Sequence, residues 1–346
     1  MRTLYTVPAS GQTLARAETP IAFVQAILLA YAKRKRSPAT LLKLAQITPR
    51  QLANPKARIT SLQFEQASAT AMQELDDEAL GWFERPLHWG SYGMLVRASL
   101  TAPTLGVALK RWCRHHNLLT HSIHLAVSEA NGLATLELQE RADLGALREF
   151  CIVSVLRNVL GVACWLSDSH IALSQTRLRF AAPAHQDSYS VLFEGPCRFA
   201  ADTNSLQFDA GYLALPLRRD EAALQRMLER ALLLTVRPYR RDRLLVEKVR
   251  QTLSQFPQHT RRAEDLADRL HMSVRTLHRQ LHEEGSSLQM LKDAVRRDLA
   301  IGQLQRSQRP LKQIAQTVGF KSEKSFIRAF KNWTGQTPHA LRQAAQ

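Results

Sequence analysis

The stretch PLKQIAQTVGFKSEKSFIRAFKNWTGQTPHALR occupies residues 310–342 and decides the fold of the last third of the chain. Its pattern also occurs 48 positions earlier, where LADRLHMSVRTLHRQL covers residues 266–281. In each copy a first apolar helix leads through a short turn to a serine, Ser273 or Ser322. Serine is a preferred N-cap residue, so a second helix starts there. We therefore predict two helix-turn-helix units.

The second helix of each unit carries a basic face. Leu277 and Leu281 are four positions apart, as are Phe326 and Phe330, so each pair forms an apolar stripe facing a small core. The long polar side chains fall on another face, and Arg or Lys on an exposed helix can meet guanine acceptors in the major groove. A merely solvated basic helix is the alternative for one copy, but the duplication favours duplex DNA as the partner.

Residues 310–342 closely resemble the C-terminal half of AraC/XylS-type transcription regulators, in the GF before the second recognition helix, the FxRAFKxWxG run and the TP before the last turn. In that family two helix-turn-helix units, joined by a long helix, sit in successive major grooves. The resemblance implies groove-facing roles for Arg275, His278, Arg279, Glu323, Lys324, Ser325 and Arg328. Lys321 departs from the family pattern, and we expect it to add a phosphate contact or to change which bases are read.

The segment between the two units is predicted to be one long helix. Residues 287–305 contain no proline, and four apolar residues keep helical spacing from Leu288 to Leu299. Nineteen helical residues span roughly 28 Å, and successive major grooves on one face of the duplex lie about 34 Å apart. The second helix of each helix-turn-helix unit is called a reader below. A connecting helix of this length, with the thickness of the units it joins, can place both readers on one side of the DNA.

Charge is concentrated in the same region. The chain has 346 residues and a net charge of +17, of which residues 237–346 carry +12 and residues 1–236 carry +5. An excess of positive charge on a third of the chain points to a polyanion bound there. A membrane surface or RNA would fit this composition as well, so the doubled motif is what selects duplex DNA.

The rest of the composition indicates a protein of the cytoplasm without cofactor or metal. The four cysteines form no CxxC pair, which argues against a zinc site or redox motif and suits a reducing compartment: Cys113, Cys151, Cys164 and Cys197. The apolar run from Ile21 to Tyr31 is too short to span a bilayer, and its basic residues follow it rather than precede it. We therefore expect no membrane partner.

The larger N-terminal part reads as an α+β domain. Residues 121–128 and 133–139 alternate in polarity across Asn131-Gly132, which predicts a hairpin. Further strands are expected at residues 176–180, 196–200 and 205–209, in an antiparallel or mixed sheet. Helices are expected at residues 20–36, 38–46, 61–80, 104–118 and 144–167.

This part also resembles a known domain, with lower specificity. WGSYGMLVRASLTAPTLGVALKRWCRHHNLL (residues 89–119), a hairpin, a long helix and SVLFEGPCRFAADTNSLQFD (residues 190–209) look like the arabinose-binding-type effector domain found in some of these regulators, including relatives of ornithine-utilisation regulators. The resemblance implies effector binding and a homodimer, without implying arabinose. We therefore expect a loosely ordered N-terminus (1–18), an effector and dimerisation domain (19–217), a linker helix with a bend at Pro238 (218–241) and a DNA-binding domain (242–346).

No motif names the effector. Pockets combine aromatic walls with a few polar groups, so the residues to examine first are Tyr92, Trp112, His115, His116, Arg148 and Trp165, although ordinary packing explains each of them as well. His115, His116, His121 and His124 raise metal binding, but no fitting carboxylate or cysteine completes a ligand set.

The sequence thus predicts a sequence-specific transcription regulator, with double-stranded DNA and RNA polymerase as partners and a small-molecule effector that shifts DNA affinity by linkage. Two alternatives remain open. The N-terminal domain can serve dimerisation alone, or the chain can be an enzyme fused to a DNA-binding domain, which the cysteine spacing disfavours.

Overall fold

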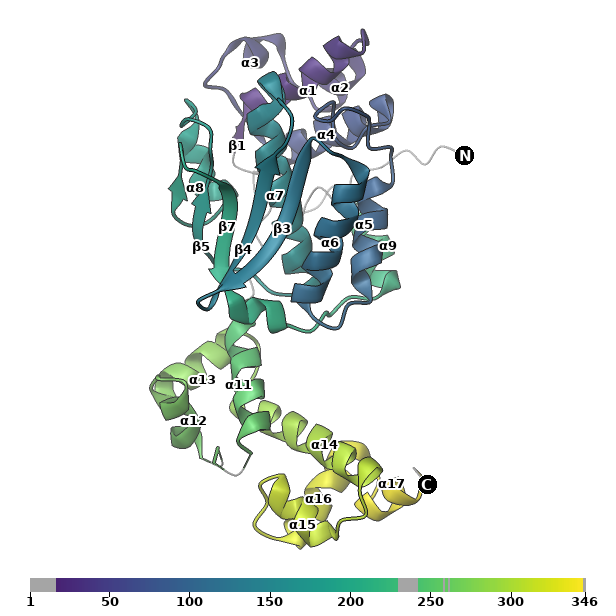
Figure 1. The fold of residues 1–346 in the computed structure, drawn as a ribbon, viewed down its shortest axis with the longest axis vertical. Helices are drawn as coiled ribbons and strands as arrows, with labels where there is room; N and C mark the ends of the chain where they lie inside the picture. Colours follow the sequence, from purple (N-terminus) through teal and green to yellow (C-terminus); the bar gives the residue numbers. More distant parts are fainter. Residues whose placement is uncertain (1–16, 230–241, 258, 261, 345–346) are drawn as a thin grey trace. The chain divides into compact units, whose positions relative to one another are not determined.

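The computed structural model describes residues 17–229, 242–257, 259–260 and 262–344, and the chain divides into two compact units, Met1–Arg240 and Arg241–Gln346 (Figure 1). The predicted class, an α+β domain followed by an all-α domain, is confirmed. Of the expected linker helix, α9 (Glu221–Leu228) is described, with Asp220 as its N-cap. Residues 230–241, with the expected bend at Pro238, lie outside the described residues, as does most of the expected loose N-terminus.

The first unit contains a five-stranded sheet of order β3-β4-β7-β5-β6 (Figure 1). The predicted hairpin is confirmed: β3 (Ile123–Ala130) and β4 (Leu133–Glu140) pair antiparallel across Asn131 and Gly132, both with positive φ. β7 (Asn204–Asp209) pairs antiparallel with β4 and with β5 (Leu173–Arg177). β6 (Cys197–Arg198) runs parallel to β5, so the sheet is mixed.

Two strands differ from the predicted ranges. The strand expected at residues 176–180 begins three residues earlier, at Leu173, and ends at Arg177; the one expected at residues 196–200 has only two regular residues. Beyond Arg177 the two segments still form backbone hydrogen bonds. Leu178 N–H donates to Arg198 O, and Ala200 N–H donates to Phe180 O. The pairing continues there without regular strand geometry, which sequence alternation alone does not reveal.

α7 (Arg148–Ser167) forms the core of the first unit. Sixteen of its 20 residues are buried, and it packs against α6 and β7. The segment Gly145–Ser167 is long and apolar enough to cross a membrane, but 89% of its most apolar window is buried inside the protein. This helix is therefore apolar all round because it is a core helix.

The remaining helices of the first unit surround this core: α1 (Ile21–Lys33), α2 (Ala39–Leu44), α3 (Pro49–Ala53), α4 (Ser61–Leu75), α5 (Ser91–Leu100), α6 (Leu105–Leu119) and α8 (Tyr189–Leu192). Three 3₁₀ turns lie at Gly145–Leu147, Gln186–Ser188 and Ala210–Ala214. α4 ends five residues earlier than predicted, because Asp76 adopts a left-handed conformation. The Asp77 carboxylate then accepts backbone N–H bonds from Ala79, Gly81 and Leu87, which holds a turn in place of helix.

Several elements of this unit were not predicted, among them β1, β2, α3 and α5. β1 (Ala17–Pro20) and β2 (Arg58–Thr60) pair in a two-stranded sheet, so Ala17 and Glu18 do not belong to a loose terminus. This pairing joins segments about forty residues apart and has no local signal. α3 starts at Pro49 within a capping box made by Thr48 and Gln51, between the helices expected at residues 38–46 and 61–80. α5 follows Gly90 and depends on caps from a distant turn.

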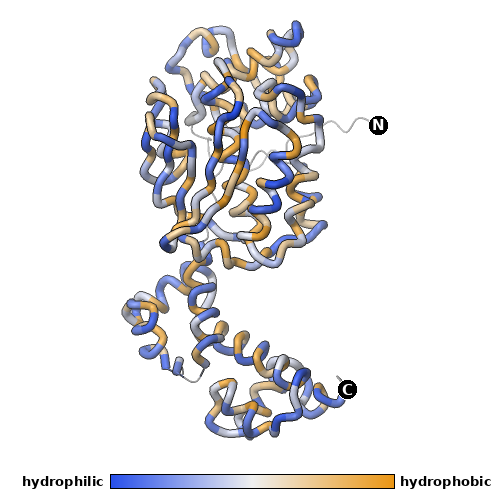
Figure 2. The backbone as a smooth tube through the Cα atoms, in the orientation of Figure 1, coloured by the Kyte–Doolittle hydropathy of each residue, from blue (hydrophilic) through white to orange (hydrophobic). Residues whose placement is uncertain are grey.

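The second unit consists of helices around two small cores. Its elements are α11 (Leu244–Gln255), α12 (Ala263–Arg269), α13 (Val274–Glu283), α14 (Leu288–Arg306), α15 (Leu311–Thr317), α16 (Glu323–Thr334) and α17 (Pro338–Ala344). Hydrophilic and hydrophobic residues alternate along these helices, as Figure 2 shows. The first core gathers residues of α11 to α14, and the second gathers residues of α14 to α17.

Candidate nucleic-acid interface and an N-terminal polar cluster

α13 is the second helix of the first helix-turn-helix unit. Ser273 caps it as predicted, since its hydroxyl accepts a hydrogen bond from Thr276 N–H at 3.1 Å. Leu277 and Leu281 have no exposed surface and anchor the helix on the first core. The opposite face is open: Arg275, His278 and Arg279 are all exposed.

α16 repeats this arrangement in the second helix-turn-helix unit. The Ser322 hydroxyl accepts from Ser325 N–H at 3.2 Å, and Phe326 and Phe330 are fully buried in the second core. The turn before it contains Gly319 in a left-handed conformation, as His271 is in the first turn. The residues predicted to face DNA are exposed, apart from Glu323, which is partly exposed: Lys321, Glu323, Lys324, Ser325 and Arg328.

The two faces differ in how many of their donors are already engaged. Arg279 forms an ion pair with Glu283 at 2.9 Å, and the Ser325 hydroxyl accepts a hydrogen bond from the Ser322 hydroxyl at 2.8 Å. Five other side chains have no hydrogen bond or ion pair within the described part of the chain: Arg275, His278, Lys321, Lys324 and Arg328. Both helix-turn-helix units thus present exposed basic side chains that have no partner among the described residues, and such side chains can bind base edges and phosphates.

α14 connects the two helix-turn-helix units and belongs to both small cores of the C-terminal domain. Its first half contributes Leu288, Leu291 and Val295 to the first core, and its second half contributes Ala300 and Leu304 to the second core. Leu299 packs against both. One unbroken helix of 19 residues, roughly 28 Å long, serves both cores, so it links the two recognition helices through a rigid element.

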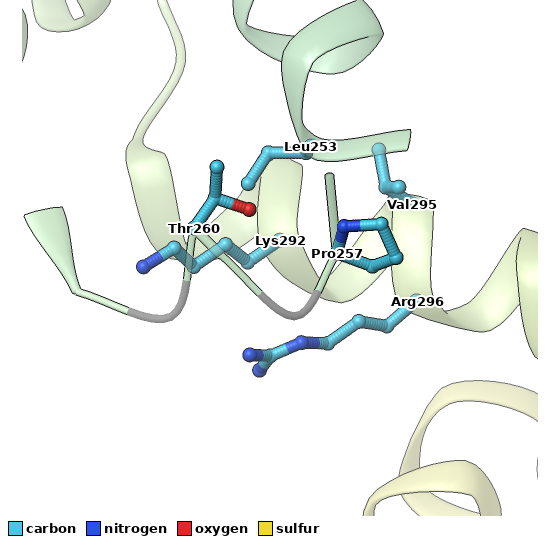
Figure 3. Close-up of a pocket in the computed structure, with 6 residues that line it drawn as sticks. All are labelled: Leu253, Pro257, Thr260, Lys292, Val295 and Arg296. Atoms are coloured by element: carbon cyan, nitrogen blue, oxygen red, sulfur yellow. The ribbon is translucent and has the colours of Figure 1, made fainter. Parts of the chain in front are cut away.

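Further contacts stabilise the two helix-turn-helix units, and these were not predicted from the sequence. The Arg296 guanidinium lies 5.1 Å from the centre of the Phe320 ring, which joins α14 to the second turn. Arg296 and Lys292 also line a small hollow with Pro257 and Thr260 (Figure 3). Lys292 is only 7% exposed, and burial lowers the pKa of its amine. Two basic residues four positions apart on one helix face were the available signal.

The structure brings some of the expected effector residues together. The rings of Tyr92 on α5 and Trp112 on α6 pack edge to face, with centres 5.7 Å apart. His116 lies one helical turn after Trp112 and packs against Phe83 at 6.0 Å. Burial lowers the pKa of His116 to about 4, so its ring is neutral at neutral pH. His115 lies on the same helix, with its Nδ1 atom buried.

The other two expected effector residues are engaged elsewhere in the first unit. Arg148 begins α7 and holds the Glu140 carboxylate with two hydrogen bonds, at 2.5 and 2.8 Å. Trp165 lies near the end of α7, where the Arg219 guanidinium stacks 5.6 Å from its ring centre. Both have a structural role, and neither makes a ring contact with Tyr92 or Trp112 in the described part of the chain.

A partly buried carboxyl beside Tyr92 was not predicted. Glu78 Oε2 accepts a hydrogen bond from Tyr92 N–H at 2.6 Å, and Oε1 accepts from Gly90 N–H at 2.8 Å, so this side chain caps the start of α5. Burial raises the pKa of Glu78 above its ordinary value. In the sequence Glu78 is one of three consecutive acidic residues and falls within the helix expected at residues 61–80, so its role as a cap was not foreseen.

Family models match both units. Residues 36–217, more than half of the chain, match the arabinose-binding domain of AraC transcription regulators, and residues 266–344 match a helix-turn-helix domain.

Curated relatives match over nearly the full length. The chain is 29% identical to the ornithine utilization regulator of Pseudomonas aeruginosa over 329 residues, which cover 94% of this chain and 96% of the relative. It is 25% identical to an uncharacterised helix-turn-helix transcriptional regulator of Mycobacterium bovis, covering 87% of this chain and 89% of that protein. Both alignments span the N-terminal and the C-terminal units.

Solved structures give weaker similarity. The transcriptional regulator CdpR of Pseudomonas aeruginosa aligns over 93% of this chain and 98% of its own, with 18% identity and a TM-score of 0.34. The DNA-binding domain of AdpA, solved in complex with a target DNA, aligns over 29% of this chain and 90% of its own, with 29% identity and a TM-score of 0.26.

Proposed function

The chain belongs to the AraC family of DNA-binding transcription regulators, and from that premise we propose that α13 and α16 read two successive major grooves of one operator under the control of a small-molecule effector. Base-reading roles fall to Arg275 and Arg328, with His278, Arg279, Glu323, Lys324 and Ser325 beside them. Lys321 contacts a phosphate. The remaining sections of the chain bind the effector and form a homodimer.

One observation carries the DNA-reading proposal. The chain builds the same reader twice, with a serine-capped helix, a fully buried apolar pair and unengaged cations on the open face, and joins the copies by one helix. A solvated surface has no need of two equivalent faces at a fixed separation. Duplex DNA offers matching grooves about one helical turn apart.

The proposed regulator works in the cytoplasm beside its DNA, contacts RNA polymerase and has no enzymatic activity. The thiols support the last point, because burial raises the pKa of Cys113 to about 12 and that of Cys197 to about 11, which disfavours the reactive thiolate. The similarity to an ornithine utilization regulator supports control by a metabolite. A dimer would place two such double readers on the DNA.

Selection of binding sites from random duplexes with the full-length protein tests this proposal. We expect two preferred base blocks about 10 base pairs apart. Arg275→Ala is expected to relax one block and Arg328→Ala the other, each costing about 1–3 kcal/mol in binding free energy.

Arg297→Ala is the matched control, since Arg297 lies on α14 and pairs with Asp298 at 2.9 Å. This variant removes one positive charge from the same unit and is expected to leave both base blocks unchanged. Absence of base preference in the wild type, or unchanged preference in both reader variants, would overturn the assignment of α13 and α16.

A further inference from the structure

Unpaired polar atoms are concentrated in one part of the first unit. Nine buried side-chain nitrogen and oxygen atoms lack a hydrogen-bond partner within the described residues. Five of them belong to one short section of the chain: Trp82 Nε1, Tyr92 Oη, Trp112 Nε1, His115 Nδ1 and His116 Nδ1. Buried polar groups in folded proteins almost always have partners, so such a concentration calls for one.

The five residues lie close together in the fold. Trp112, His115 and His116 are spaced i, i+3 and i+4 and thus share one side of α6. α5 packs against α6 (Figure 1). The Tyr92 ring lies against the Trp112 ring. The Phe83 ring contacts both His116 and Trp82, with ring centres 6.0 Å apart in each case. We call these five side chains and Phe83 the aromatic cluster.

The aromatic cluster offers donors together with π faces. A tyrosine hydroxyl and an indole N–H both donate hydrogen bonds, and an indole N–H cannot accept one. Trp82, Trp112 and His116 are each at least nine-tenths buried, so these groups have lost water. A ligand that satisfies them must present acceptor oxygens. Because unmet buried donors are costly, such a ligand gains affinity by pairing them.

A carboxyl group borders the same cluster. Glu78 is bonded to the backbone N–H of Tyr92 at 2.6 Å and has no cationic side chain as partner within the described residues. Its negative charge also acts on the Tyr92 phenol, whose pKa burial and Glu78 together raise. A carboxylate next to a tyrosine ring is a favourable surrounding for an ammonium group.

We propose that the aromatic cluster binds a free amino acid as the effector, with the ligand carboxylate accepting hydrogen bonds from Tyr92 and Trp112 and its ammonium group facing Glu78 and the rings. This deepens the proposed function, on which it rests, by naming the ligand class. A purely anionic ligand lacks a cation to pair with here, and a purely cationic ligand leaves the donors unmet. A zwitterion answers both requirements.

Thermal unfolding of the full-length protein with each common L-amino acid in turn tests the ligand class. At least one amino acid is expected to stabilise the first unit in a concentration-dependent manner. The analogues of that amino acid that lack the amine or the carboxylate are expected to have no effect. If no amino acid stabilises the protein, or if a deaminated analogue stabilises it equally well, the proposal is wrong.

Tyr92→Phe separates a ligand contact from a packing role, because it removes only the unpaired hydroxyl. The apo variant is expected to be as stable as the wild type or more so, while the midpoint concentration of the amino acid rises about tenfold or more. Thr176→Val is the matched control, since it removes an unpaired buried hydroxyl from β5, outside the aromatic cluster. An unchanged midpoint for Tyr92→Phe would overturn the site.

DNA binding by the same variants keeps this proposal distinct from the proposed function. Tyr92→Phe without ligand is expected to bind the selected operator with the wild-type affinity. The amino acid at the wild-type midpoint concentration is expected to change the operator affinity of the wild type and to leave that of Tyr92→Phe almost unchanged. Loss of operator binding by the wild type itself would count against the DNA-reading proposal and would leave the thermal-shift result standing.

Discussion

The Glu284 carboxylate accepts a hydrogen bond from the backbone N–H of Val246 at 2.8 Å and one from Leu245 N–H at 3.2 Å. Glu284 is the C-cap residue of α13, and Leu245 and Val246 lie in the first turn of α11. The end of the first reader therefore caps the first helix of its unit. α11 is also where the chain enters this unit after residues 230–241, so a displacement of α11 reaches α13 through Glu284.

This contact predicts a pH dependence. Burial raises the pKa of Glu284 from 4.5 to about 7, because the ionised carboxyl loses more hydration than the two N–H groups return. The folded unit thus holds the proton more tightly than the unfolded chain. Its contribution to stability is complete below pH 4.5 and is lost as the pH rises through 7.

Glu284→Gln removes the titration and keeps an acceptor oxygen. Between pH 5 and pH 8 we expect the wild type to lose about 1 kcal/mol of stability relative to this variant, since solvent screens the half-exposed carboxyl. Hydrogen exchange of α11 and α13 in the full-length protein, followed by mass spectrometry at each pH, measures the difference. Parallel pH profiles of the two proteins would contradict the prediction.

The serine caps predict a second set of effects. Ser273→Ala and Ser322→Ala each remove the acceptor of a helix N-terminal N–H, at a cost of about 1 kcal/mol. Because the capped turns carry the readers, both variants are expected to weaken operator binding. Ser287→Ala removes the same kind of cap from α14, where Ser287 accepts from Met290 N–H. It is expected to cost similar stability without loosening either base block in site selection.

Lys321 predicts a change in salt dependence. A lysine that contacts a phosphate releases counterions when the protein binds, and its removal weakens binding to all sequences about equally. Lys321→Ala is therefore expected to lower the slope of log affinity against log salt by about 1, with both base blocks preserved. Titrations by fluorescence anisotropy at several salt concentrations give this slope. Lys110→Ala, at an exposed position of α6, serves as the charge control. A relaxed base block in Lys321→Ala would instead assign Lys321 to base reading.

The local features of the readers and of the β3–β4 hairpin could be predicted from the sequence. The caps at Ser273 and Ser322, the apolar pair Phe326 and Phe330, and the turn at Asn131 each depend on residues within a few positions of one another. Propensity, capping and side-chain period act over that range, so the pattern alone carries them. The same holds for the exposed cations, whose face follows from the helical repeat.

The long-range contacts could not be predicted in this way. Glu78 caps α5 from a turn twelve positions earlier, and Arg296 reaches Phe320 across the second turn. Glu284 reaches Val246 across 38 positions. Such pairs form only when the backbone brings distant segments together, and no periodicity records them. For the same reason the sequence could not show that Arg148 binds Glu140 on β4, or that Tyr92 and Trp112 contact each other.

Two glycines predict opposite responses to the same substitution. Gly319 has φ +88°, and a Cβ there would lie 2.8 Å from the backbone oxygen of Pro257. Gly319→Ala is therefore expected to cost more than about 1 kcal/mol and to displace the second turn, which lowers operator affinity at the α16 block. Gly302 lies inside α14 with no atom within 4 Å of its added Cβ. Gly302→Ala is expected to stabilise the unit by about 0.5–1 kcal/mol, because alanine loses less conformational freedom in a helix. Urea unfolding of the full-length variants measures both effects. Equal stability of the two variants would mean that the contact between Pro257 and the second turn does not constrain the readers, whose spacing would then depend on α14 alone.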